Sequence, residues 1–92
     1  MDNISKHYEI AKELNNLYAK KNEDYGDSFH KSYEEYGMTM PCIRLEDKLN
    51  RFKTLIKNEK QQVNDESIED TLKDLANYAI MTLMELRGQK DE

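Results

Sequence analysis

The stretch from Asp65 to Leu86, DESIEDTLKDLANYAIMTLMEL, decides the fold expected of this chain. Its apolar residues recur at three- and four-residue steps, which is the spacing of one face of a helix. The spacing predicts an amphipathic helix over about 66–87 that buries this stripe in an all-α core. The stripe consists of Ile68, Leu72, Leu75, Ala79, Leu83 and Leu86.

The C-terminal half of that helix, AIMTLMEL, is apolar nearly all round. At 100° per residue, Met81 and Met84 point well away from the core stripe. A helix with a second apolar face in a small bundle usually buries that face against another chain. We therefore expect a homo-oligomer, and the alternative is that the first helix of the chain covers both faces.

Three more helices are expected upstream. An amphipathic helix over about 3–22 has a start that Asp2 or Asn3 can cap, and a short helix over 30–36 ends at Gly37. A third helix is predicted from Pro41 to about 58. The apolar positions are Ile4, Tyr8, Ala11, Leu14, Leu17 and Tyr18 in the first helix, and Leu45, Leu49, Phe52 and Ile56 in the third. The chain is thus predicted to be one domain, residues 1–92, forming a small antiparallel bundle of three long helices plus a short one.

Composition and charge exclude several classes of protein. The net charge of −5 argues against duplex nucleic acid as a partner, because binding to phosphate backbones needs a basic surface. No run approaches the roughly 20 apolar residues of a membrane span, and the first residues lack the order of a signal peptide. We expect a cytoplasmic protein whose lone Cys42 is a buried apolar thiol.

The predicted helix over 41–58 carries a stripe of cations. Arg44, Lys48 and Arg51 fall within about 60° of one another, with Asp47 beside them. Such a stripe can hold a phosphate, because arginine offers a planar fork and lysine a point charge. The alternative is a solvated face whose cations pair with acids on neighbouring helices.

The helix over 66–87 supplies a complementary polar face. Asp70, Asp74 and Asn77 lie along one side of it, followed by Tyr78. Asp70 and Asp74 form a like-charged i, i+4 pair, which a magnesium ion or a cationic partner would relieve. Salt bridges from these acids to the cation stripe are the alternative. No zinc spacing, P-loop or nucleophile elbow accompanies them.

Three stretches together carry a resemblance: KNEDYGDSFHKSYEEYG, IRLEDKLNRFKTLIK and DESIEDTLKDLANYAIMTLMEL. They resemble the phage and bacterial family called nucleotide modification associated domain 1, formerly a domain of unknown function. The resemblance implies a nucleotide or nucleotide-like ligand and a phage or prophage origin, hence a location in the host cytoplasm. The two uses it suggests are supply to nucleotide modification and sequestration of a host immune nucleotide, an anti-defence role.

The last two predicted helices are also similar in layout to MazG-like all-α nucleoside triphosphate pyrophosphohydrolases. Those enzymes hold Mg²⁺ through an EExxE helix and an ExxD helix. Glu46 and Asp47 match the first acidic pair, but Asn50 replaces the last acid. In the second motif Asp74 matches, but Thr71 replaces its partner. Each lost carboxylate weakens a magnesium cage, so binding without efficient hydrolysis is favoured.

The segment KNEDYGDSF, residues 21–29, completes the hypothetical nucleotide site. The aromatic rings can stack on a base, the acids can hydrogen-bond a sugar or base edge, and glycine allows close approach of the backbone. The alternative is that the aromatic residues plug the end of the bundle while the acids cap the next helix. The ligand-binding residues predicted here are Lys21, Asp24, Tyr25, Gly26, Asp27 and Phe29, in addition to Arg44, Lys48, Arg51, Asn77 and Tyr78.

The leading hypothesis is therefore a protein that binds a phosphorylated nucleotide or a nucleotide-derived signal and sequesters or carries it, with no cofactor assigned. The rival is a Mg²⁺-dependent pyrophosphohydrolase that uses Asp47, Asp70 and Asp74 as catalytic metal ligands. A third hypothesis is a helical protein-interaction module without a small ligand.

Overall fold

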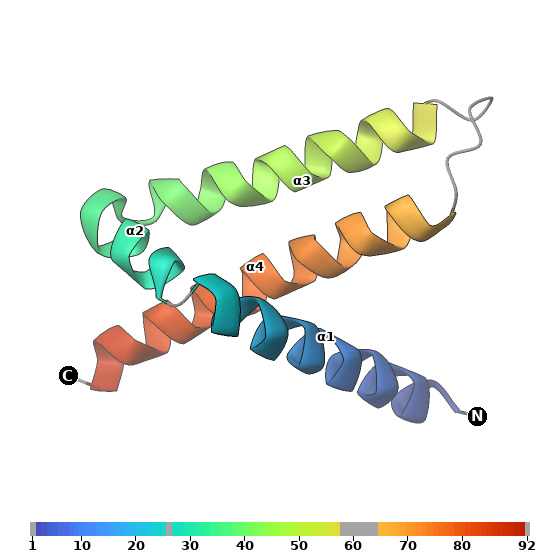
Figure 1. Ribbon diagram of the computed structural model, residues 1–92, viewed down its shortest axis with the longest axis horizontal. Coiled ribbons are helices and arrows are strands. Elements are labelled where there is room, and N and C mark those ends of the chain that lie inside the picture. The colour runs from blue at the N-terminus through green and yellow to red at the C-terminus, as the bar shows by residue number, and fades with distance from the viewer. Residues whose placement is uncertain (1, 26, 58–64, 92) are drawn as a thin grey trace.

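The computed structural model describes residues 2–25, 27–57 and 65–91, and the regular structure in these ranges is helical, without strands. Four helices follow one another along the chain, α1 (Asn3–Tyr25), α2 (Ser28–Tyr36), α3 (Thr39–Lys57) and α4 (Asp65–Asp91) (Figure 1). The predicted all-α class, with three long helices and a short one, is confirmed. Each helix is slightly longer than its apolar pattern predicted.

Two local signals set helix ends where the sequence placed them. The carboxylate of Asp2 accepts a hydrogen bond from the Ser5 amide at 2.7 Å and so caps the start of α1, which lowers the pKa of Asp2. Gly37 ends α2 with a φ of 67°, and its amide donates to the Tyr33 carbonyl at 2.7 Å. Glycine is suited to this position because the left-handed region strains residues that carry a Cβ.

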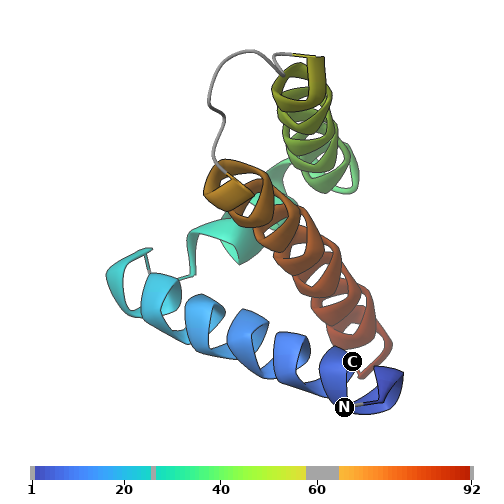
Figure 2. The same ribbon diagram turned by 90° about the vertical axis from the view of Figure 1, so that its right-hand side faces the viewer.

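The helices form a two-helix layer with α1 on one side. Along its length α3 runs beside α4, and the chain returns through α4 in the opposite direction (Figure 1). In the view turned by 90°, α1 and α2 lie on one side of α4 (Figure 2). The α2 helix forms the corner between the end of α1 and the start of α3. None of the helices in the described ranges is long and apolar enough to cross a membrane.

The buried core of the described residues is small and draws on all four helices. Its buried side chains are Leu14, Tyr33, Met40, Pro41, Thr71 and Asn77. The two polar members are satisfied: the Thr71 hydroxyl donates to the Ser67 carbonyl at 2.8 Å, and the Asn77 amide donates to the Leu14 carbonyl at 3.2 Å. These bonds remove the penalty of burying polar groups.

Several residues predicted for the core are exposed in the single chain. On α4, Leu72 and Leu83 are 42% and 52% exposed. Leu49 and Ile56 of α3 and Ile4 and Tyr8 of α1 are also exposed. The physical reason is that α1 packs on α4 near Leu14 and beyond, so the N-terminal half of α1 and one side of the α3–α4 layer have no helix against them.

Two further predictions about burial are corrected by this arrangement. Cys42 was predicted to be a buried thiol, but it is exposed, because it is turned about 100° around α3 from the buried Pro41. The alternative that the first helix covers both faces of α4 is also wrong for the single chain. Ile80, Leu83 and Met84 all remain between 43% and 52% exposed.

Candidate functional site

A groove of about 520 Å³ lies where the C-terminal part of α1, α2 and the middle of α3 and α4 meet. Eight of the site residues predicted from the sequence line this groove, and they come from all four helices or the residues beside them. Tyr18, Met81 and Met84 add apolar surface to its walls. The eight predicted residues are Lys21, Asp27, Phe29, Arg44, Lys48, Asp74, Asn77 and Tyr78.

The carboxylate of Asp74 joins three helices on the wall of this groove. The Lys21 ammonium of α1 donates to Asp74 Oδ1 at 2.9 Å, and the Lys48 ammonium of α3 lies 3.2 Å from Oδ2. Partial burial raises the pKa of Asp74, but the bonds from Lys21 and Lys48 outweigh it and leave that pKa lowered. The alternative expectation, a salt bridge between this helix and the cation stripe, is confirmed for Lys48.

Arg44 is the groove cation without an anionic partner in the described part of the chain. It is exposed and lies one turn before Lys48, so the two cations share one wall. A guanidinium in this state keeps all its donors available, and its planar fork matches the oxygens of a phosphate. Arg44 is therefore the best-placed group in the groove to receive an anion.

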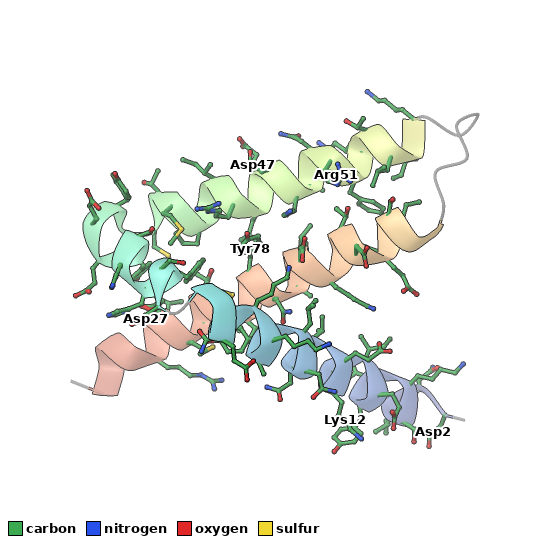
Figure 3. The ribbon with its side chains drawn as sticks, viewed as in Figure 1. Asp2, Lys12, Asp27, Asp47, Arg51 and Tyr78 are labelled. Atoms are coloured by element: carbon green, nitrogen blue, oxygen red, sulfur yellow. The ribbon has the colours of Figure 1, made fainter. Side chains whose placement is uncertain are left out.

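A pair of aromatic rings forms another part of the wall. Phe29 of α2 and Tyr78 of α4 stack with their ring centroids 6.1 Å apart and an interplanar angle of 22°. Both side chains are half-buried. Tyr78 lies between α3 and α4 (Figure 3). The pair offers a flat apolar surface of the kind on which a planar base stacks, and it also helps to close the end of the bundle.

Asn77 has a structural role as well as a place in the groove. It is only 8% exposed, and its amide holds the main chain of α1 at Leu14. This bond fixes how α1 crosses α4 and hence where Lys21 lies, seven residues further along α1. The sequence predicted Asn77 as a ligand-binding residue. In the structure its side-chain amide bonds to α1, so it has a structural role in positioning that helix.

A histidine and an acid of the same groove, His30 and Glu85, were not foreseen, and Glu34 lies beside them outside the groove. His30 Nδ1 lies 2.8 Å from a carboxylate oxygen of Glu85, and Nε2 lies 3.3 Å from Glu34. The hydrogen bond to Glu85 raises the pKa of His30, opposed by desolvation and supported by the charges of Glu85, Glu34 and Asp27. The i, i+4 spacing of His30 and Glu34 was visible in the sequence, but Glu85 is 55 residues away.

Other predicted site residues lie elsewhere. Arg51 and Asp70 are exposed and do not line the groove. Asp47 lines a second cavity of about 390 Å³, which shares Arg44 with the groove. Figure 3 shows Asp47 on the side of α3 away from α4. Gly26 and the side chains of Asp24 and Tyr25 lie outside the described residues.

The three acids proposed for magnesium are not brought together in this chain. Among the side chains that the structure describes, no three of His, Cys, Asp or Glu are grouped so that they can hold a metal ion. The position of the missing acid on α4 is taken by Thr71, which is 2% exposed and bonded to its own helix. The hydrolase hypothesis therefore needs carboxylates supplied by another chain or a rearrangement of this one.

Comparison with known proteins adds one finding. The family model described as nucleotide modification associated domain 1 matches residues 21–86, which include the three stretches that carry the resemblance. No curated protein and no solved structure matches the chain. The similarity to MazG-like enzymes thus rests on the motif comparison alone.

Proposed function

We propose that this chain, which belongs to the nucleotide modification associated domain 1 family, binds a phosphorylated nucleotide or nucleotide-derived signal in the groove. The observation that carries the proposal is the gathering of cations from α1 and α3 beside a stacked aromatic pair from α2 and α4. Charge for phosphate and a flat apolar surface for a base are the two features that a nucleotide needs.

The phosphate end of the ligand is assigned to Arg44, Lys48 and Lys21. An ammonium group has three donors, and each lysine has one bond to Asp74 in the structure. Both lysines can therefore turn remaining donors towards a phosphate, while Arg44 offers its unused fork. Asp74 holds the two lysines close together, and their mutual repulsion is offset by its charge.

The base end is assigned to Phe29 and Tyr78, with Asp27 within reach of polar ligand atoms at the same groove. Stacking accepts any base, so the groove favours nucleotides as a class. The protein then acts by holding the ligand, either to carry it to nucleotide modification or to withhold a host immune nucleotide if the chain is of phage origin. Self-association would suit a sequestering protein, but binding in this groove does not depend on it, because one chain supplies the whole lining.

Binding is favoured over hydrolysis by the chemistry of the groove. Two of its three acids, Asp74 and Glu85, are already bonded to cationic or imidazole partners, which leaves Asp27 as the third. A magnesium-dependent reaction on polyphosphate needs several free carboxylates around the ions. The pyrophosphohydrolase remains the rival candidate because Asp74 matches one acid of the MazG-like motif.

The test is a thermal-shift screen of the purified protein against nucleoside triphosphates, cyclic nucleotides and ADP-ribose-type signals, with and without Mg²⁺. A ligand at 100 times its dissociation constant stabilises the folded state by about 2.7 kcal/mol. Chromatography of each hit then separates the candidates: intact ligand supports binding, and Mg²⁺-dependent cleavage supports the enzyme. A screen without any shift favours the protein-interaction module.

A matched pair of variants locates the site. Arg44→Gln removes a cation from the groove, whereas Lys53→Gln removes one from an exposed position of the same helix outside the groove. We expect Arg44→Gln to weaken binding of the best hit by about tenfold or more, the effect of a charge-assisted hydrogen bond. Lys53→Gln should leave binding unchanged. Equal effects of the two changes would show general charge attraction and contradict the assignment.

A further inference from the structure

The single chain exposes more surface than a chain of its size should. A compact protein of 10.9 kDa is expected to keep about 5,600 Å² accessible. This chain has 7,579 Å² accessible, roughly 2,000 Å² more than that expectation. Its radius of gyration is 15.1 Å, against about 12 Å for a compact domain of 92 residues. The excess means that a large area is left uncovered.

The uncovered surface is apolar along one side of the α3–α4 layer. On α4, Leu72, Ile80 and Leu83 are exposed, and the steps of eight and three residues between them keep them on one face. On α3, Leu49 and Ile56 are exposed and one heptad apart. Together these five side chains define the outer face of the layer.

Most of the outer face points away from α1. Leu72 and Leu83 lie about 140° and 120° around α4 from Asn77, the residue bonded to α1, and Ile80 lies at the edge of the face, about 60° from Asn77. The groove side of the layer carries Lys48 and Asp74, which bond to each other and to α1. By helical rotation, Leu49 and Ile56 lie on the other flank of α3 from the cation stripe, and Leu72 and Leu83 lie more than 100° from Asp74 on α4. No helix of the described residues covers the α3–α4 layer on the side away from α1 and α2 (Figure 2).

We propose that a second copy of this chain packs on the outer face, so that the α3–α4 layers of two copies form a four-helix bundle. The area argues for this occupant. A stable interface removes about 800 Å² from each partner, and obligate homodimers remove more, so the excess of the single chain matches an obligate interface. Leucine and isoleucine at steps of three, seven and eight residues also provide the side chains with which helices pack against helices.

The test compares two isoleucines that are similarly exposed. Ile80 on the outer face is 43% exposed, and Ile10 on α1 is 54% exposed. Sedimentation velocity and light scattering give the mass of the wild type, Ile80→Glu and Ile10→Glu over a range of protein concentrations without nucleotide. We expect an assembly of at least two copies for the wild type and Ile10→Glu, and a monomer for Ile80→Glu, because a buried unpaired carboxylate opposes packing.

Three results would overturn the proposal: a monomeric wild type, an Ile80→Glu variant as assembled as the wild type, or loss of assembly in Ile10→Glu alone. Should Ile80→Glu fail to give helical circular dichroism, Ile80→Ala replaces it. The Ala variant should need at least about tenfold higher protein concentration to assemble. Since the masses are measured without ligand, failure here leaves the nucleotide proposal standing, and the reverse also holds.

Discussion

At the scale of single residues, Asp74 determines what the groove can hold. Its carboxylate occupies one donor of Lys21 and one of Lys48. It is therefore an internal anion whose charge would repel a phosphate bound to the remaining donors of the two lysines. The two hypotheses for the groove make opposite predictions for this residue.

Changing Asp74 to Asn should tighten binding of the best nucleotide hit roughly three- to tenfold, because it removes a competing charge from a partly exposed site. Isothermal titration calorimetry measures this. Asp70→Asn is the control, since Asp70 lies one turn earlier on α4 and is exposed outside the groove. Weaker binding in Asp74→Asn with intact helical content, or loss of Mg²⁺-dependent cleavage, would favour the hydrolase instead.

His30 should make the stability of the protein depend on pH. Its folded-state pKa is raised above 6.5, first by the hydrogen bond to Glu85. A raised pKa means that the contribution of this contact is fully present below about pH 6.5. It is lost as the pH rises through the raised value.

Urea unfolding at pH values from 5.5 to about 8.5 tests this linkage, since the window brackets an ordinary histidine pKa. The wild type should lose stability across the upper part of the window, and His30→Gln should lose less. His7→Gln, a change on the exposed face of α1, serves as the control. Identical pH profiles for the wild type and His30→Gln would disprove the role of His30.

The residues of the site were partly predictable from the sequence. Lys48, Asp74 and Phe29 were predicted as site residues because each belongs to a local pattern of charged or aromatic residues. The spacing of residues within one helix is the same in the sequence and in the folded chain. Arg51 shared the pattern of Arg44 and Lys48 but lies outside the groove, because a stripe along a helix is longer than one cavity. Glu85 was missed because only tertiary packing brings it to His30, 55 residues away.

At the scale of helices, the turn between α2 and α3 depends on one glycine. Gly37 has a φ of 67° and a ψ of −154°, a region that is essentially restricted to glycine. Apart from Gly37 and its two chain neighbours, no atom lies within 4 Å of a Cβ built there, so backbone strain alone should decide the effect of a substitution.

Gly37→Ala should destabilise the folded state by about 1–3 kcal/mol, and thermal or chemical unfolding measures this. Gly88→Ala is the matched control, because Gly88 lies within α4 with equally open space around it. There alanine should be neutral or stabilise by up to about 1 kcal/mol, through its higher helix propensity. Equal destabilisation by both substitutions would contradict the strain argument.

The helices themselves were predictable and their partners were not. Apolar spacing in a single stretch is enough to predict α3 and α4, because helical periodicity is a local property. Which face is covered depends on where another helix crosses. The bond between the Asn77 amide and the Leu14 carbonyl sets that crossing for α1. An asparagine and a leucine in two separate helices give no sign in the sequence that they will be bonded. The apolar stripes therefore predicted the helices correctly, but they predicted that Leu72 and Leu83 would be buried, and both side chains are exposed.

At the scale of the whole molecule, stability should depend on protein concentration. If folding and assembly are coupled through the outer face, mass action raises the unfolding midpoint as the protein is concentrated. We expect such a rise for the wild type and none for Ile80→Glu. Calorimetric scans over a wide concentration range measure it, and a midpoint independent of concentration in both proteins would argue that the folded monomer is self-sufficient.

The crossing of α1 over α4 also bears on how fast a ligand comes and goes. α1 is fastened near Leu14 and Lys21, while its N-terminal half, including Ile4 and Tyr8, touches little else. Yet the same helix supplies Tyr18, Lys21 and Asn22 to the groove wall. Detachment of α1 would remove one wall of the groove while α3 and α4 stay folded. Such a local opening costs less free energy than unfolding of the whole chain. A phosphate bound to Lys21 would oppose that opening. The residence time of the nucleotide in the groove would then depend on how long α1 stays packed on α4.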